Sequence, residues 1–169
     1  MIREELSFAI FGNNKQTLEA DYIKEVFAYL TKHNAQIFVE EHLYENLCKD
    51  FVKRELVSGV ITDDNFNTDY AISLGGDGTF LRVASKVGEK QIPIIGVNMG
   101  RLGFLANVLP GEINEVLDAI YRGDFDIDER SVIKIESENE VIETSPYALN
   151  DISILKRDNA SMITIHTNI

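Results

Sequence analysis

Hydrophobic residues along most of the chain alternate between short apolar runs and longer segments with helical spacing. The runs at 6–11, 35–39, 70–74 and 92–97 have the length and composition of buried strands. Apolar positions with helical spacing follow them at 18–34, 43–51, 80–87 and 110–123. Strands that alternate with helices form parallel sheets, so the pattern predicts an α/β fold. The polar segment 53–68, with its Asp63-Asp64-Asn65 run, has no clear period, and we expect it to be a solvated connection.

The period of the pattern changes after residue 124. Short apolar stretches at 132–135, 141–142, 147–154 and 162–165 are separated by polar turns, which is typical of antiparallel strands. We therefore divide the chain into a Rossmann-like α/β domain, residues 1–124, and an incomplete antiparallel β domain, residues 125–169. If nothing follows these strands, their edges would be unpaired. Open edges recruit partners or become disordered, so we expect either a homo-oligomer or mobile strands.

The junction between the strand at 70–74 and the helix at 80–87 is rich in glycine. Gly75, Gly76 and Gly78 remove every Cβ there, so that a polyphosphate could approach the main-chain N–H groups at the start of the helix. Asp77 interrupts the glycines. A carboxylate beside a phosphate is repelled unless it holds a metal, a metal-bound water or a substrate hydroxyl, so Asp77 indicates chemistry. The alternative is a polar turn, because Asp-Gly is a common turn pair.

Two familiar phosphate-binding loops are excluded by spacing. A P-loop requires a lysine directly after its last glycine, and here Thr79 follows Gly78. The dinucleotide fingerprint requires glycine or alanine where this chain has Leu81.

A second glycine-bearing loop, residues 98–106, follows the strand at 92–97. In an open parallel sheet the ligand crevice lies at the carboxyl ends of the strands. We therefore expect this loop, the Gly75 loop and Gly12-Asn13 to meet at one edge. Phe104 either contacts the ligand there or is a buried anchor of the loop together with Leu102.

Composition limits the partners and the compartment. The 16 basic and 28 acidic residues give a formal charge of −12, which argues against a nucleic-acid or anionic-membrane surface. The phosphate of a small-molecule substrate must then be met by local groups. The single Cys48 cannot form an intramolecular disulfide, and no apolar run at the N-terminus has signal or transmembrane length, so we expect a cytoplasmic protein. The three histidines show no metal-ligand spacing with Cys48.

Three motifs, in this order and spacing, resemble those of the NAD kinases: Leu74-Gly-Gly-Asp-Gly-Thr79, Gly96-Val-Asn-Met-Gly-Arg-Leu-Gly-Phe-Leu105 and Ala148-Leu-Asn-Asp-Ile152. The first motif alone is not specific, because lipid kinases of the diacylglycerol type and phosphofructokinases carry related loops. A lipid or sugar kinase, or a non-catalytic dinucleotide-binding module, is therefore the alternative. The second and third motifs favour NAD kinase.

The resemblance implies a β-sandwich after the α/β domain, with residues 125–169 as its beginning. It also implies that ATP phosphorylates the 2′-hydroxyl of the adenosine ribose of NAD, with Mg²⁺ or another divalent cation held mainly by the substrate phosphates. The family's later Thr-Gly-Ser-Thr-Ala-Tyr segment does not occur in this sequence. The chain thus resembles the first part of an NAD kinase, and we expect it to be inactive by itself.

Roles for individual residues follow from the same resemblance. Asp77 resembles the proton acceptor. Asn150 and Asp151 resemble the pair that holds the dinucleotide, although the family usually has glutamate where this chain has Asp151. Arg82, one turn into the helix, is either a phosphate contact or a helix-surface arginine. The remaining expected nucleotide contacts are Gly75, Gly76, Gly78, Thr79 and Phe104.

Overall fold

The computed structural model describes residues 5–12, 20–48, 53–100, 103–138, 145–153 and 166. Its strands are β1 (Ser7–Gly12), β2 (Gln36–Glu40), β3 (Gly59–Ile61), β4 (Tyr70–Gly75), β5 (Ile94–Asn98), β6 (Ile133–Lys134) and β7 (Tyr147–Ala148). Its α-helices are α1 (Ala20–Lys32), α2 (Glu41–Leu43), α3 (Asp77–Val87) and α4 (Ile113–Arg122). A π-helical turn, Tyr44–Cys48, continues α2, and 3₁₀ turns lie at Arg54–Leu56, Gly88–Lys90 and Pro110–Glu112.

The five longer strands form one parallel sheet in the order β3-β2-β1-β4-β5. The predicted α/β fold is therefore confirmed. The order reverses between β1 and β4, and in open α/β sheets this is the point where ligands bind, outside the carboxyl ends of the strands. The glycine loop directly follows β4, so it lies at this switch point.

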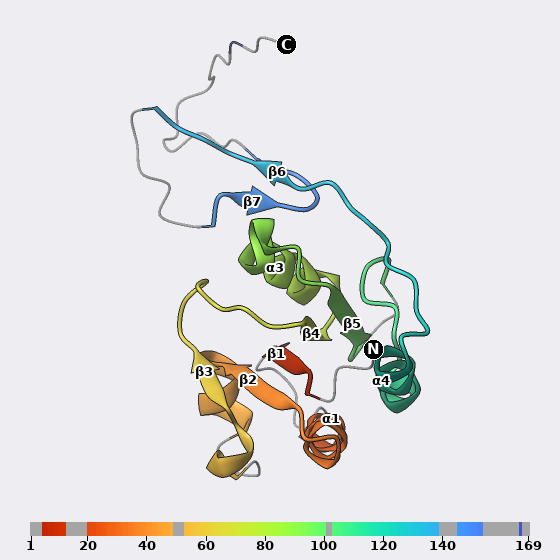
Figure 1. The fold of residues 1–169 in the computed structure, drawn as a ribbon. Coiled ribbons are helices and arrows are strands. Elements are labelled where there is room, and N and C mark those ends of the chain that lie inside the picture. Colours follow the sequence, from red (N-terminus) through yellow and green to blue (C-terminus); the bar gives the residue numbers. More distant parts are fainter. Residues whose placement is uncertain are drawn as a thin grey trace.

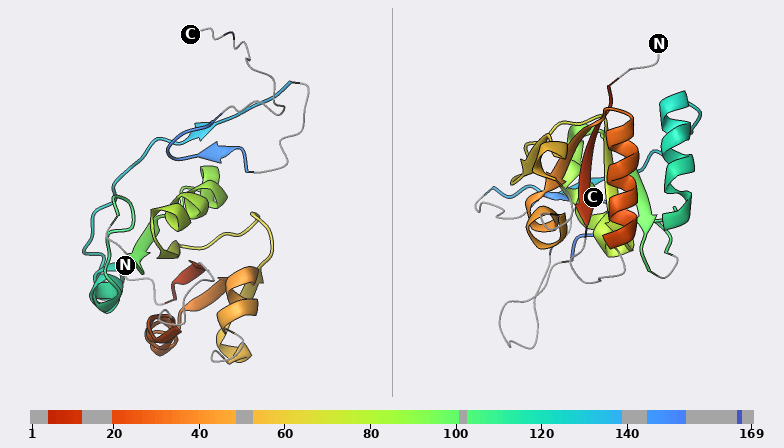
Figure 2. Two further views of the ribbon diagram at one scale, coloured as in Figure 1. Left: turned by 180° about the vertical axis from the view of Figure 1, so that it is seen from behind. Right: turned by 90° about the horizontal axis from the view of Figure 1, so that it is seen from below.

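Side chains alternate between the two faces of the sheet, and each face has its own core. On one face, Phe8 and Ile10 of β1 pack with apolar residues of α1 and α4. On the other face, Ala9 and Phe11 pack with Val83 and Val87 of α3. Figures 1 and 2 show α1 and α4 side by side on one face of the sheet and α3 on the opposite face. The apolar runs of the strands follow from this burial on both faces.

The β6–β7 hairpin lies on the outer side of α3, which separates it from the sheet (Figure 1). Its strands pair antiparallel, with Ile133 opposite Ala148, as the sequence predicts. Ser85 of α3 donates a hydrogen bond to the main-chain oxygen of Tyr147 at 2.7 Å, which fastens the hairpin to the helix. The expected strands at 141–142 and 162–165 lie outside the described residues, and the domain boundary at 124 stays a proposal.

Two expectations about local structure were wrong. Residues 53–68 are not only a solvated connection, because they contain the edge strand β3 and bury Val57, Ile61 and Phe66. Three residues are too few to show a strand period. The loop after β4 is also shorter than expected, since α3 begins at Asp77 and includes Gly78 and Thr79 in its first turn.

The Asp63-Asp64-Asn65 run is exposed, as expected for a solvated connection. The Asp63 carboxylate accepts a hydrogen bond from the N–H of Asn65, and Asp64 pairs with Lys86 of α3. Within the described ranges, no helix is both long and apolar enough to cross a lipid bilayer.

Candidate active site

The glycine loop leaves the start of α3 open. Gly75 must lack a side chain, because a Cβ there would lie 2.3 Å from Oγ1 of Thr79. A Cβ at Gly76 or Gly78 would meet nothing within 4 Å, so the main chain at these two residues borders free space. That space is a hollow of about 330 Å³ lined by Gly76, Gly78, Thr79 and Arg82. The four residues are thus brought together as the sequence predicts.

The carboxylate of Asp77 is turned toward the second glycine-bearing loop. Its Oδ2 accepts a hydrogen bond from the N–H of Phe104 at 2.8 Å, and its Oδ1 accepts from Leu105 and Ala106 at 3.0 and 3.1 Å. These main-chain donors, that of Phe104 first, lower the pKa of Asp77 below its ordinary value. Asp77 is therefore ionised at neutral pH, and it fixes the loop that carries Phe104.

Close approach of the two loops requires a glycine at position 103. A Cβ on Gly103 would lie 2.2 Å from Oδ1 of Asp77, inside the carboxylate. The loop also returns to β5, where the N–H of Asn98 donates to the oxygen of Val108 at 2.7 Å. Residues 103–106 are thus held between β5 and α3. The expectation that this loop and the Gly75 loop share one edge is confirmed.

Phe104 is 96% exposed, so the interpretation of Phe104 as a buried anchor is wrong. Leu102, the other half of that interpretation, lies outside the described residues. An aromatic side chain fully in solvent, on a loop fixed by three hydrogen bonds, is available to a ligand.

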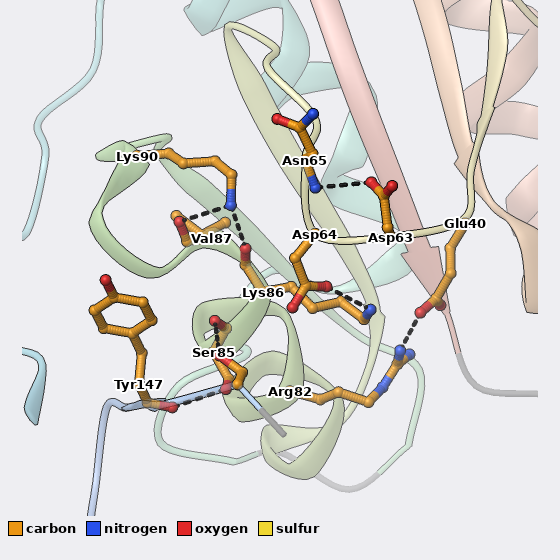
Figure 3. A network of polar contacts seen from close by, with 11 residues as sticks. Glu40, Asp63, Asp64, Asn65, Arg82, Ser85, Lys86, Val87, Lys90 and Tyr147 are labelled. Atoms are coloured by element: carbon orange, nitrogen blue, oxygen red, sulfur yellow. Dashed lines mark hydrogen bonds and ion pairs between the residues drawn. The ribbon is translucent and has the colours of Figure 1, made fainter. Parts of the chain in front are cut away.

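Arg82 crosses the carboxyl ends of two neighbouring strands (Figure 3). Its Nη1 donates to Oε1 of Glu40 at the end of β2, and its Nη2 donates to the main-chain oxygen of Gly12 at the end of β1, at 2.9 Å. Gly12 therefore belongs to the same edge, as expected, and Asn13 lies outside the described residues. Arg82 is exposed on the surface of α3, with 40% of its side chain accessible, and it also joins three elements of the α/β domain.

Asn150 and Asp151 follow β7 and are exposed. Nδ2 of Asn150 donates to Oδ1 of Asp151 at 3.1 Å. Both residues line a second hollow of about 280 Å³, together with residues of α3 and of β7. Arg82 lines both hollows, so the two halves of the expected site are neighbours across α3.

Two functional candidates were missed from the sequence, Glu40 and Gly103. Glu40 closes a predicted strand, a signal that could have marked it, since strand ends form the ligand edge. Gly103 could have been found from its place just before Phe104 in the second motif. In the part of the chain that the structure describes, no three His, Cys, Asp or Glu side chains come together as a metal site.

Comparisons with known proteins identify the family of this chain. Residues 8–125 match the family model of the ATP-NAD kinase N-terminal domain. The chain is 43% identical to the NAD kinase of Bacteroides fragilis over 164 residues, which is 97% of this chain and 57% of that protein. It is 38% identical to the NAD kinase of Porphyromonas gingivalis over 159 residues, which is 94% of this chain and 54% of that protein.

A solved structure supports the fold. The crystal structure of yeast NADH kinase complexed with NADH matches with a TM-score of 0.67 at 18% identity, covering 85% of this chain and 46% of that one. The chain therefore spans about half the length of the relatives that it matches. Because the family model covers most of the sequence, this chain belongs to the ATP-NAD kinase family, whose N-terminal domain it contains.

Proposed function

We propose that the full-length protein is a cytoplasmic NAD kinase, which transfers the γ-phosphoryl group of ATP to the 2′-hydroxyl of the adenosine ribose of NAD, and that this chain supplies its nucleotide-binding α/β part. Family membership supports the reaction. One observation carries the assignment: an ionised Asp77 lies in the first turn of α3, next to a glycine loop that borders free space.

The polyphosphate would bind at the hollow over Gly76 and Gly78. The N-terminus of α3 presents main-chain N–H groups there, and the helix dipole favours negative charge. The N-cap residue, Gly76, has no side chain to cap the helix. The N–H groups of Thr79 and Phe80 already donate to the main-chain oxygen of Gly76, so those of Asp77 and Gly78 are the ones that would meet phosphate oxygens. Arg82 adds a guanidinium at the wall of the same hollow.

Asp77 would accept the proton of the attacking hydroxyl. A carboxylate has about four acceptor positions, and the contacts with residues 104–106 use three of them. Oδ2 accepts one of these hydrogen bonds, so it is the oxygen with room for a hydroxyl. In the reaction the ribose oxygen forms a bond to the γ-phosphorus, the bond from that phosphorus to the ADP oxygen breaks, and the hydroxyl proton moves to Asp77.

The lowered pKa of Asp77 is compatible with this role. It keeps the carboxylate ionised, although it also makes it a weaker base. Phosphoryl transfer has a loose transition state and depends mostly on positioning and electrostatic stabilisation, so a weak base suffices.

Mg²⁺ or another divalent cation would accompany ATP. Mg²⁺ in kinases is usually held by substrate phosphates, water and one or two carboxylates, and Asp77 is the carboxylate of the glycine loop. One carboxylate in this loop is enough for a cation whose other ligands are substrate phosphates and water. When bound, the cation neutralises charge on the transferring phosphoryl group.

The dinucleotide would lie between the two hollows. Asn150 and Asp151 offer an amide and a carboxylate at one end, and the exposed ring of Phe104 offers a stacking surface. Asp151 is one methylene shorter than the glutamate usual in the family, so Asn150 is the member of the pair that we expect to contribute more to binding.

The proposal is tested by assaying the full-length protein for NADP formation from ATP and NAD, with diacylglycerol as the alternative acceptor. Mg²⁺-dependent formation of NADP and no phosphorylation of the lipid is the expected result. Lipid phosphorylation without NADP would contradict it. NAD binding without turnover would favour the non-catalytic module.

A further inference from the structure

We propose that Glu40 is a positioning residue for the reaction, because it holds the guanidinium of Arg82 in place for an incoming polyphosphate. The inference rests on the proposed function, in which Arg82 contacts phosphate. Neither Glu40 nor its partnership with Arg82 was expected from the sequence.

The first argument is burial. Glu40 ends β2 and is only 7% exposed, although a glutamate at a strand end is normally solvated. Its Oε1 accepts the hydrogen bond from Nη1 of Arg82, and its Oε2 is buried without a hydrogen-bond partner among the described residues. A buried carboxylate that depends on one arginine constrains that arginine strongly, because separating the pair leaves an uncompensated charge.

The second argument is the geometry of Arg82. Glu40 and the main-chain oxygen of Gly12 hold Nη1 and Nη2 of the same guanidinium, which fixes both its position and its plane. Figure 3 shows the contact between Arg82 and Glu40. A guanidinium has more N–H donors than these two contacts use. Since Arg82 also lines the hollow over Gly76 and Gly78, the fixed group is at the place where a phosphate would bind.

A second ion pair on the same helix lacks these features. Lys86 pairs with Asp64 at 3.0 Å, but Asp64 is exposed and neither residue lines either of the two hollows. Exposed pairs of this kind contribute little to stability. The Lys86–Asp64 pair is therefore a matched control.

The test measures binding of inorganic tripolyphosphate to the full-length protein by calorimetry, which requires neither NAD nor turnover. Glu40→Ala should weaken binding by about tenfold, because Arg82 must then be ordered by the ligand. Glu40→Gln keeps an acceptor for Nη1 and should stay within about threefold of the wild type. Lys86→Ala should leave the affinity unchanged. A protein that binds tripolyphosphate in this pattern but makes no NADP would refute the proposed reaction, and Glu40 would still be the residue that positions Arg82 for a polyphosphate.

Two results would overturn the inference. Unchanged affinity in Glu40→Ala would show that the pair is only structural. Tighter binding in both Glu40 variants would show that the carboxylate merely competes with phosphate for Arg82. If Glu40→Ala does not fold, Arg82→Lys serves instead. Lysine keeps the charge and the pairing with Glu40, but its ammonium group is not planar and cannot be held by Glu40 and Gly12 in one fixed orientation. Tripolyphosphate binding should therefore again weaken about tenfold. Wild-type affinity in Arg82→Lys would overturn the inference.

Discussion

Gly103 lies against the carboxylate of Asp77 so closely that a methyl group on its Cα would fall 2.2 Å from Oδ1. The segments that follow β4 and β5 therefore meet at Asp77, which is charged, and at Gly103, which has no side chain. Asp77 is both an acceptor for the main chain of residues 104–106 and the group that we assign to the proton of the substrate.

Gly103→Ala should lower NADP formation by the full-length protein about 10- to 100-fold, because the new methyl group displaces the carboxylate from both the loop and the substrate. Steady-state assays of kcat and KM measure the loss. Gly100→Ala is the matched control in the same loop, since a Cβ there would meet nothing within 4 Å. Equal activities of the two variants would show that the Asp77–Gly103 contact does not matter.

The loop should be sensitive to acid through Asp77. The folded-state pKa of Asp77 lies below the ordinary value of 3.8, so its contribution to folded-state stability is fully present above pH 3.8 and is lost as the pH falls through the lower, folded-state value. NMR titration of the Phe104, Leu105 and Ala106 amides should show a common transition below pH 3.8. Asp77→Asn should remove it, and an unchanged transition in that variant would assign it to another group.

Asn150→Ala in the full-length protein should raise the KM for NAD about tenfold, because one or two hydrogen bonds to the dinucleotide are lost. The melting temperature should not change. Asn150 is exposed, so little folding energy depends on it. Asn65→Ala, another exposed asparagine, controls for the substitution itself. A normal KM with a lowered melting temperature would assign Asn150 to structure.

The chain should self-associate through the β6 region, where Val132, Ile133 and Ile135 are 41%, 47% and 37% exposed. Light scattering after gel filtration should show a concentration-dependent mass, and the pair Ile133→Lys and Ile135→Lys should abolish it. Tyr22→Lys on α1, where the side chain is 41% exposed, should not. A monodisperse monomer at all concentrations would contradict the expectation.

Much of the fold could be predicted because its signals are local. Apolar runs such as Phe8 to Phe11 are buried on both faces, and the glycine loop marks the end of β4. The edge strand β3 could not be predicted, because Gly59–Ile61 depends on pairing with β2 and not on its own pattern. The pairing of Glu40 with Arg82 was equally hidden, since it joins strand and helix ends that meet only when the sheet is formed.

The central claim is that Asp77 accepts the ribose proton when NAD is phosphorylated, and the most direct test is the rate of NADP formation by Asp77→Asn in the full-length protein. Asparagine tolerates the same backbone and keeps one of the two oxygens that accept from the loop, enough for Leu105 and Ala106 but not for Phe104 as well, and it is not a base at neutral pH. Loss of a general base typically costs roughly 10²- to 10⁴-fold in rate. We predict that Asp77→Asn still binds NAD and loses NADP formation at least about a hundredfold, whereas retention of more than about a tenth of the wild-type turnover would contradict the assignment.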